Sequence, residues 1–323
     1  MNARKKDFRS KALAAVDGTY FIYFCIFSAV KKWESDSPYA HVLKSAEETD
    51  QNNLPDLTKY TDFQKILSNT ISFKFSFIED LIGKAVEELN PDTDKIYKVF
   101  SIDSPIKNNW RKKIYPSYKA QRKESKKAFD ISKAMMFAKN LICNTFDISQ
   151  LDYVVTEIKD AEGDDILATV MKDLDGFDTK VLIASDRDFL QLDNVSQYDL
   201  FGSKKEILPK LRESDGIALT PKEFLILKIL VGDVADNIPK CFSKIGEKKA
   251  IKLIKDPRLL REKLEADQIA ASQFLLNQKI ISFDYIPDSL KDVIVSYVKG
   301  RFEELDMIED KSYDFISSDL MAL

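Results

Sequence analysis

Three short apolar segments of this chain each end at an aspartate, and this pattern is the strongest constraint on its fold. The segments and the acids that follow them are ALAAV (12–16) with Asp17, KIYKVFSI (95–102) with Asp103, and KVLIAS (180–185) with Asp186. Short apolar runs of this kind are typical of buried strands. A fourth strand is expected in DYVVTEI (152–158).

Segments with helical spacing of apolar residues separate and follow these strands. We expect helices over 62–89 (one helix or two), 131–145 and 166–174, and the capping-box pattern of Thr220 and Glu223 predicts another over 221–231. Alternating strands and helices indicate an α/β fold with a mostly parallel central sheet flanked by helices. The weakly periodic, polar residues 31–61 are interpreted as an insertion or mobile loop.

Further acids follow the other predicted elements. Glu162, Asp164 and Asp165 open the helix after residues 152–158, Asp188 lies two residues after Asp186, and Asp233 and Asp236 follow LKILVG. Acids in a first helical turn are also ordinary helix chemistry, because they favour the positive end of the helix dipole. Ligand sites of open α/β sheets, however, form at the carboxyl ends of strands. One shared site therefore explains five acidic groups at this edge better than separate helix caps do.

Carboxylates gathered this closely would repel one another unless cations lie between them. Carboxylate-only sites suit hard ions such as Mg²⁺ and Mn²⁺. A single histidine, His41, and three widely spaced cysteines argue against zinc sites, disulfide frameworks and histidine-based catalysis. Two metal ions would clamp the attacking and leaving oxygens of a phosphate, so we expect a metal-bound hydroxide to attack a phosphodiester.

One competing motif is excluded by a single residue. AAVDGTYF is similar to the D-x-D-G-T signature of aspartyl-phosphate phosphatases, but the position of the nucleophilic aspartate is Ala15. Without that carboxylate no covalent phospho-enzyme can form.

The net charge of −4 hides two basic segments. Residues 107–127 hold nine lysines and arginines against one glutamate, and residues 240–261 hold eight against two acids. Each could be a solvated helix, but two dense basic segments on an acidic body predict a directed site for a polyanion.

The residue order inside each basic segment suggests nucleic acid. In the first, Trp110, Tyr115 and Tyr118 alternate with cations, and aromatic rings stack on unpaired bases. Lys119 and Arg122 are three residues apart, so on a helix they would share a face and could grip one phosphate. The second segment, IPKCFSKIGEKKAIKLI, predicts a helix, a short turn and a second helix that bind duplex phosphates without reading sequence. DNA contact is expected for Arg111, Lys112, Lys123, Lys244, Gly246, Lys248, Lys249 and Lys252.

The motifs, taken in order, resemble the 5′-nuclease family, which includes flap endonucleases and the 5′-nuclease domain of bacterial DNA polymerase I. They are VDGT, SIDS…WRKKIYPSYKAQRKES, AEGDDILA, ASDRDFLQL and GDVADNIP…IGEKKA, and together they span roughly residues 12–300. The C-terminal ISFDYIPDSLKDVIVSYVKG resembles more narrowly the ribonucleases H of T-even phages. This resemblance implies a PIN-like nuclease fold with a helical C-terminal region that contains a helix-turn-helix.

The resemblance also implies a two-metal nuclease that cuts from 5′ ends, removing RNA primers and adjacent DNA or cutting flaps during phage DNA replication. One ion is implied at Asp17, Asp103, Glu162 and Asp164 and the other at Asp186, Asp188 and Asp233, with Asp165 and Asp236 in support. The expected ion is Mg²⁺, with Mn²⁺ as a substitute. Tyr118, Lys119 and Arg122 match the catalytic part of the family's arch, expected here at 104–130.

Partners and departures follow from the same resemblance. Phage relatives work with a sliding clamp and a single-strand binding protein, so such partners are implied, together with duplex DNA and RNA–DNA bearing a 5′ strand or flap. The family's helix-turn-helix usually carries G-x-G, often with a bound K⁺. Here KIG retains only Gly246 and places Lys244 at the first glycine, so a K⁺ site is in doubt and the lysine is a candidate to replace the ion.

Two other hypotheses remain open: a branched-DNA binding module with structural metals, and a single-strand endoribonuclease. The complete acid set argues against the first, and the basic helix-turn-helix against the second. No apolar run reaches the ~20 residues of a membrane span, and the sparse cysteines fit a reducing cytoplasm, so we expect a cytoplasmic monomer. The expected division is a nuclease domain at 1–215, a duplex-binding region at 216–305, and a frayed or partner-binding tail at 306–323.

Overall fold

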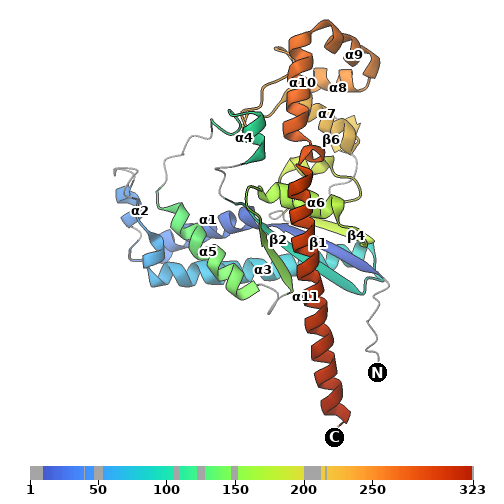
Figure 1. Cartoon of the computed structure of the whole chain (residues 1–323). Helices are drawn as coiled ribbons and strands as arrows, with labels where there is room; N and C mark the ends of the chain where they lie inside the picture. The colour runs from blue at the N-terminus through green and yellow to red at the C-terminus, as the bar shows by residue number, and fades with distance from the viewer. Residues whose placement is uncertain are drawn as a thin grey trace.

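A parallel sheet lies at the centre of the molecule (Figure 1). The computed structural model describes residues 10–39, 41–46, 54–104, 109–121, 128–146, 152–199, 212–214 and 217–321. Within these residues the sheet has five strands, all parallel, in the order β3-β2-β1-β4-β5. The strands are β1 (Lys11–Asp17), β2 (Lys95–Ile102), β3 (Tyr153–Glu157), β4 (Thr179–Ile183) and β5 (Ser196–Tyr198). The predicted α/β architecture is thus confirmed.

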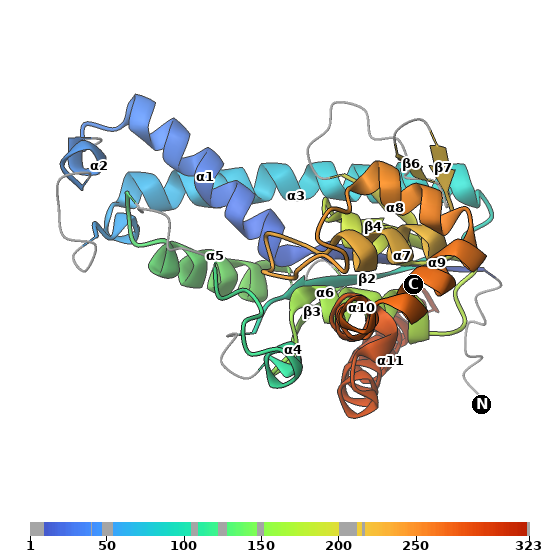
Figure 2. The same cartoon turned by 90° about the horizontal axis from the view of Figure 1, so that it is seen from above.

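Helices cover both faces of the sheet, because successive residues of a strand point to opposite sides. Ala12, Ala14 and Val16 of β1 belong to one hydrophobic core, and Leu13 and Ala15 belong to a second. The first core is covered by α1 (Gly18–Asp36), α3 (Thr61–Leu89) and α5 (Ile131–Phe146), and the second by α6 (Gly163–Asp173) and α11 (Asp288–Met321). Figure 2 shows α1, α3 and α5 together on one side of the sheet and α11 on the other.

A third core lies in the helical region. It contains Leu227, Ile251 and Ile280 and joins α7 (Pro221–Val231), α8 (Glu247–Ile254) and α10 (Gln268–Ile281). Helix α9 (Pro257–Ala266) connects α8 to α10, and the 3₁₀ turn η4 (Phe283–Tyr285) connects α10 to α11. In Figure 1, α10 and α11 form one long column with α8 and α9 at the end opposite the C-terminus. The expected division at residue 215 stays a prediction.

The interpretation of residues 31–61 as a loop is wrong for most of its described part. Helix α1 continues to Asp36, α2 spans His41–Ala46, and the 3₁₀ turn η1 spans Leu57–Lys59. Helix α1 continues because Trp33 extends its buried face and packs against Tyr60 and Phe63, with ring centroids 5.4 and 6.1 Å away. Residues 47–53 lie outside the described part of the chain. The predicted helix at 62–89 is confirmed as the single helix α3.

The helix expected immediately before Gly246 is also wrong. Residues 232–246, all described, form a turn-rich segment between α7 and α8, and Gly246 is the N-cap of α8. Asp233 and Ile238 exchange backbone hydrogen bonds of 2.9 and 2.7 Å, which closes a tight loop instead of a helix. Gly232 starts this loop at φ +69°, where an added Cβ would lie 2.4 Å from the carbonyl oxygen of Ile238.

An antiparallel ladder pairs β6 (Arg212–Ser214) with β7 (Ile217–Leu219). Among the described residues, none of the helices combines the length and the apolar character that a membrane-spanning segment needs.

Candidate active site

Three of the predicted acids lie at the carboxyl edge of the sheet. Asp17 is the last residue of β1, Asp103 directly follows β2, and Asp186 lies three residues after β4. Because β1 pairs with both β2 and β4, these strand ends are neighbours. Burial raises the pKa of Asp17, and the charges of Asp103 and Asp186 raise it further. The sheet order therefore gathers the three acids at one edge, next to the point where the chain reverses its direction of winding.

Helix α6 adds acids to this edge. Glu162 is its N-cap and Asp164 lies in its first turn, where the charges of Asp17 and Asp186 act on it. The amide of Gly163 donates a 2.5 Å hydrogen bond to Asp103, which ties the end of β2 to the start of α6. A Cβ at Gly163 would lie 3.0 Å from the same oxygen, so glycine permits this close approach.

Asp165, which was expected to support the metal ligands, is buried next to Glu162. Its side chain is fully buried, pairs with Arg111 at 2.8 Å, and accepts hydrogen bonds from the Glu162 amide (3.1 Å) and Trp110 Nε1 (3.2 Å). The contacts to its own helix complete a capping box with Glu162. Both oxygens of Asp165 thus face groups of the protein, and its support of the metal ligands stays a prediction.

Arg111, predicted to contact DNA, is instead buried. It lies in the short helix α4 (Trp110–Ile114), is 4% exposed, and pairs with Glu162 at 3.0 Å as well as with Asp165. Its Nε donates to the carbonyl oxygen of Ile280 in α10, at 3.0 Å. A sequence window shows its charge but not its partners, which are 51 and 54 residues away along the chain. Arg111 therefore binds Glu162 and Asp165 from inside the protein and does not face solvent.

Tyr118 and Lys119 both bind Glu162. The Tyr118 hydroxyl lies 3.0 Å from a Glu162 oxygen and 3.2 Å from an Asp236 oxygen, so the two carboxylates share its one hydrogen, and the Lys119 ammonium pairs with the other Glu162 oxygen. Tyr118 is 3% exposed, so the expectation that its ring stacks on an unpaired base is wrong. Lys119 has φ +57°, a left-handed conformation, and its amide donates to the carbonyl oxygen of Asp236 at 2.9 Å. Tyr118 and Lys119 are thus held against Glu162 and Asp236.

The remaining basic residues lie apart from the acids. Lys112 is half-buried in α4, and the predicted DNA-contacting lysines of the second segment are exposed on α8 and just before it: Lys244, Lys248, Lys249 and Lys252. Gly246 is exposed at the N-cap of α8. Arg122 and Lys123 lie outside the described residues. No described contact joins the α8 lysines to the acid cluster, so the helical region presents its charge as a separate surface.

Lys228 is a site residue that the sequence analysis missed. Its ammonium lies 2.7 Å from Asp188 and 2.7 Å from Asp233, and so joins two of the three predicted ligands of one metal ion. Asp188 belongs to the 3₁₀ turn η3 (Arg187–Gln191) after Asp186, and Lys228 to α7. The sequence did contain a signal for its role, because Lys228 is the only charged residue in the apolar run FLILKILVG. A lone lysine in a buried helix calls for an acidic partner.

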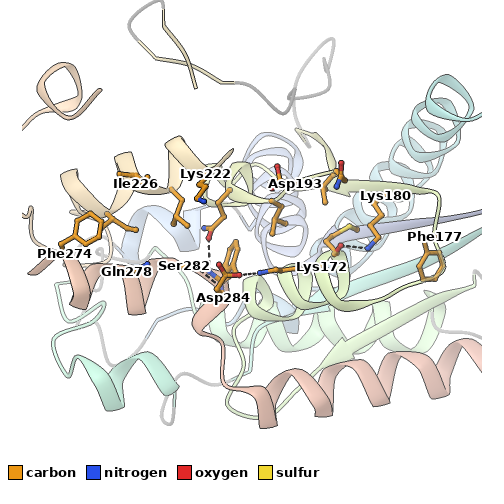
Figure 3. Close-up of a pocket in the computed structure, with 18 of the residues that line it drawn as sticks. Lys172, Phe177, Lys180, Asp193, Lys222, Ile226, Phe274, Gln278, Ser282 and Asp284 are labelled. Carbon is orange, nitrogen blue, oxygen red and sulfur yellow. Dashed lines mark hydrogen bonds and ion pairs between the residues drawn. The ribbon is translucent and has the colours of Figure 1, made fainter. Parts of the chain in front are cut away.

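The acids line one small cavity of about 120 Å³. Its charged and phenolic lining residues are Arg111, Tyr118, Lys119, Glu162, Asp164, Asp186, Asp188, Asp233 and Asp236. A larger cavity, of about 730 Å³, lies elsewhere between α6, α7 and α10 and contains none of the predicted site residues (Figure 3). The candidate active site is therefore identified by the acidic residues that line the smaller cavity, and not by cavity volume.

The pKa values divide the acids into two groups. Burial, with repulsion from neighbouring acids, raises the pKa of Asp17 to about 7 and that of Asp164 well above its usual range. Burial and Asp186 also raise the pKa of Asp188 to about 6, although Lys228 opposes the change. For Glu162, burial is outweighed by Lys119 and Arg111, and its pKa is lowered. The protein's own cations thus compensate only part of the acidic charge.

The donor set fits a hard divalent cation. It consists of carboxylates, and the raised pKa values show that additional positive charge would stabilise Asp17, Asp164 and Asp188 in their ionised forms. In the described part of the chain, no three potential ligands converge closely enough to hold one ion as they stand. Lys119 is paired with Glu162, and Lys228 with Asp188 and Asp233. Ion binding would therefore draw these carboxylates away from the lysines.

Without divalent cations, the free energy of unfolding is expected to fall as the pH rises from about 5 to about 7. The folded-state pKa of Asp17, about 7, lies above its ordinary value of 3.8, so in this window the folded chain binds more protons than the unfolded chain. Denaturant titrations in EDTA at several pH values measure the slope. Asp17→Asn keeps the hydrogen bond from the Tyr20 amide, and it should make the slope of stability against pH shallower. Equal slopes in both proteins would contradict the raised pKa of Asp17.

The matching family model and two similar curated proteins are described as 5′-3′ exonucleases or flap endonucleases. Residues 62–215 match the family described as "5′-3′ exonuclease, N-terminal resolvase-like domain". The chain is 30% identical over 161 residues to a 5′-3′ exonuclease of Buchnera aphidicola, a match that covers 49% of this chain and 52% of the relative. It is 30% identical over 155 residues to flap endonuclease Xni of Shewanella oneidensis, covering 47% and 55%. The match thus spans about half the length of these relatives.

Solved structures agree on the fold. The 5′-exonuclease of T5 with bound zinc ions has a TM-score of 0.57 at 19% identity, covering 91% of this chain and 99% of that one. The bacteriophage T5 flap endonuclease in a complex with DNA and metal ions has a TM-score of 0.55 at 17% identity, with the same coverage. At these identities the likeness concerns the architecture, which extends over nearly the whole described chain.

Proposed function

We propose that this chain is a member of the 5′-nuclease family and a divalent-metal-dependent phosphodiester hydrolase, acting as a 5′-3′ exonuclease and flap endonuclease. The observation that carries the proposal is the acid-lined cavity. Acids from β1, β2, α6, η3 and the loop after α7 meet there or directly beside it, together with two lysines. Such a set suits the joint binding of hard cations and a phosphate.

We assign the metal ions to two groups of carboxylates. One ion would be held by Asp17, Asp103, Glu162 and Asp164, and the other by Asp186, Asp188 and Asp233, with Asp236 in support. When bound, the ions supply the positive charge that activates the nucleophile and stabilises the reacting phosphate. The chain itself orients these ligands. Arg111 and Tyr118 hold Glu162 from the buried side, and Lys228 holds Asp188 and Asp233 together.

Lys119 is the proposed phosphate-positioning residue. It lines the same cavity as the acids, and its left-handed backbone is held by the carbonyl oxygen of Asp236. A phosphate that enters between Lys119 and the metal ions would take over the pairing that Glu162 now makes with the ammonium. Arg122, which follows it by one helical turn in sequence, is proposed for the same phosphate.

We propose duplex DNA and RNA–DNA with a 5′ single strand or flap as substrates. The exposed lysines on and before α8 provide charge for the duplex without base readout. The proposal also includes the removal of RNA primers in phage replication, with Mg²⁺ as the natural ion. The proposed partners are a sliding clamp and a single-strand binding protein, and the protein is proposed to be a monomer in the host cytoplasm. The support for the proposal is the ordered set of 5′-nuclease motifs.

The test is cleavage of a 5′-labelled RNA–DNA primer annealed to a DNA template, with Mg²⁺ or with EDTA. We expect short 5′-labelled products that require Mg²⁺, and recovery of cleavage when Mn²⁺ replaces it. Equal cutting of the unannealed strand would favour a single-strand endoribonuclease. Tight, salt-sensitive binding with no cleavage in any divalent ion would favour a branched-DNA binding module.

A further inference from the structure

The last turns of α10 contact Arg111, the turn η3 and the loop that carries Asp233 and Asp236. The carbonyl oxygens of Ile280 and Ile281 accept hydrogen bonds from Arg111 (3.0 Å) and from Gln191 (3.3 Å). Arg111 supports Glu162, and Gln191 ends the turn that contains Asp188. The third contact is made by Asn277, which is fully buried. Helix α10 therefore lies directly behind the candidate active site, on the side of the helical region.

The carboxamide of Asn277 joins the two ends of the loop that carries Asp233 and Asp236. Its Nδ2 donates to the carbonyl oxygens of Ile229 and Pro239, both at 2.8 Å. Ile229 lies four residues before Asp233, and Pro239 three residues after Asp236. One planar group, with both hydrogens in use, thus fixes the separation of the two ends of the loop.

The opposite side of this loop is fastened to the segment that carries Lys119. The Lys119 amide donates to the carbonyl oxygen of Asp236 at 2.9 Å, and the Asn237 side chain donates to the carbonyl oxygen of Ser117 at 2.8 Å. A shift at the base of the loop would therefore move Asp233, Asp236 and the backbone of Lys119 together. Asn277 sits at that base and touches none of these acids itself.

The polar tie matters because a cavity lies next to it, beside the core that joins α7 to α10. Ile226 and Ile229 of α7 and Phe274 and Gln278 of α10 line the cavity of about 730 Å³ shown in Figure 3. Where apolar side chains line a cavity, they forgo part of the packing that would fix the two helices against each other. The hydrogen bonds of Asn277 supply a fixed spacing at this point.

We propose that Asn277 is a positioning residue of the active site, which sets the loop of Asp233 and Asp236, and with it the backbone of Lys119, at the distance from the acids of the sheet edge that cleavage requires. This inference rests on the proposed nuclease function. Asn277 acts through backbone carbonyl groups, and its replacement should affect the chemical step more than the binding of the nucleic acid.

The first test compares Asn277→Leu with the wild-type protein on a 5′-flap substrate under single-turnover conditions with Mg²⁺. Leucine has nearly the same size but cannot donate to Ile229 or Pro239. We expect the cleavage rate to fall by about 10- to 100-fold, since a displacement of about 1 Å can cost about 100-fold. The enzyme concentration at half-maximal rate should stay within about twofold, as for loss of an interaction made only in the transition state.

Two control variants separate positioning from general destabilisation. Gln273→Met removes the donor to Asn277 Oδ1 (2.8 Å) but leaves both Nδ2 hydrogen bonds, and should cleave at the wild-type rate. Ile142→Val lowers stability in the distant first core and should also leave the rate unchanged. If Asn277→Leu does not fold, Asn277→Asp, which keeps the acceptor and loses both donors, takes its place. A wild-type rate in a folded Asn277 variant would overturn the inference.

A second readout needs no activity. Hydrogen exchange of the folded proteins, without DNA or metal, should be faster in residues 232–238 of Asn277→Leu than in the wild type, and unchanged in β1. Unchanged exchange in residues 232–238 would overturn the positioning role. If the wild-type protein cleaves no substrate, the proposed function fails, while the exchange experiment still decides whether Asn277 holds the loop.

Discussion

Asp186→Asn is expected to abolish metal-dependent cleavage while the chain stays folded. Asp186 is exposed at the end of β4, and its carboxylate accepts the 2.7 Å hydrogen bond from the Asp188 amide that starts η3. Asparagine can accept the same hydrogen bond, so the turn is retained and only the charge is lost. A metal ion supplies several kcal/mol of transition-state stabilisation, and each ~1.4 kcal/mol is a factor of ten, so we expect a loss of at least about 10³-fold.

The measurement is single-turnover cleavage of the flap substrate, accompanied by a thermal melt and a binding titration in Ca²⁺. Asp193→Asn is the matched control, because it is the same exchange seven residues later, on an exposed residue outside the acid cavity. Binding and melting temperature should stay close to wild type in both variants. Cleavage by Asp186→Asn at a rate near that of Asp193→Asn would remove Asp186 from the active site.

Lys228→Met is expected to destabilise the protein in EDTA and to make its stability strongly dependent on divalent cations. Without the ammonium, Asp188 and Asp233 face each other with no cation between them. Removing one partner of a buried ion pair costs about 3–5 kcal/mol, and because Lys228 is 19% exposed we expect about 2 kcal/mol. A divalent ion can compensate for the missing charge, so Mg²⁺ should stabilise the variant more than the wild type.

Denaturant titrations with EDTA and with a series of Mg²⁺ concentrations test this expectation. Lys222→Met, in the first turn of the same helix, also removes one lysine, but an exposed one outside the acid cavity. It should change neither the stability in EDTA nor the response to Mg²⁺. If Lys228→Met and Lys222→Met respond alike, Lys228 does not balance the charge of the acids.

The elements that carry the site were predictable because their signals are local. Short apolar runs ending in an acid predicted β1, β2 and β4, and the capping-box residues Thr220 and Glu223 predicted the start of α7, where both reciprocal hydrogen bonds are present. Parallel pairing then places the strand ends together, since all strands point the same way. The sequence therefore predicted that the acids lie at one edge of the sheet.

Errors arose where a residue's role depends on partners far away in the chain. The basic segment suggested that Arg111 and Tyr118 face nucleic acid, whereas both are buried against Glu162. Lys228 was missed because its two acids come from different elements. The helical end of α1 was taken for a loop because the burial of Trp33 requires Tyr60 and Phe63, which come later in the chain.

By itself, the sequence determined the parallel α/β architecture, the edge at which the carboxylates meet and the kind of ion that suits them, because periodicity and residue chemistry act over a few neighbouring positions. The tertiary structure alone decided which cations neutralise which acids. Lys228 and Lys119 became part of the site, while Arg111 and Asp165 became a buried pair behind it. Ion pairing depends on distance in space and on burial, and both are set only when the helical region packs against the sheet.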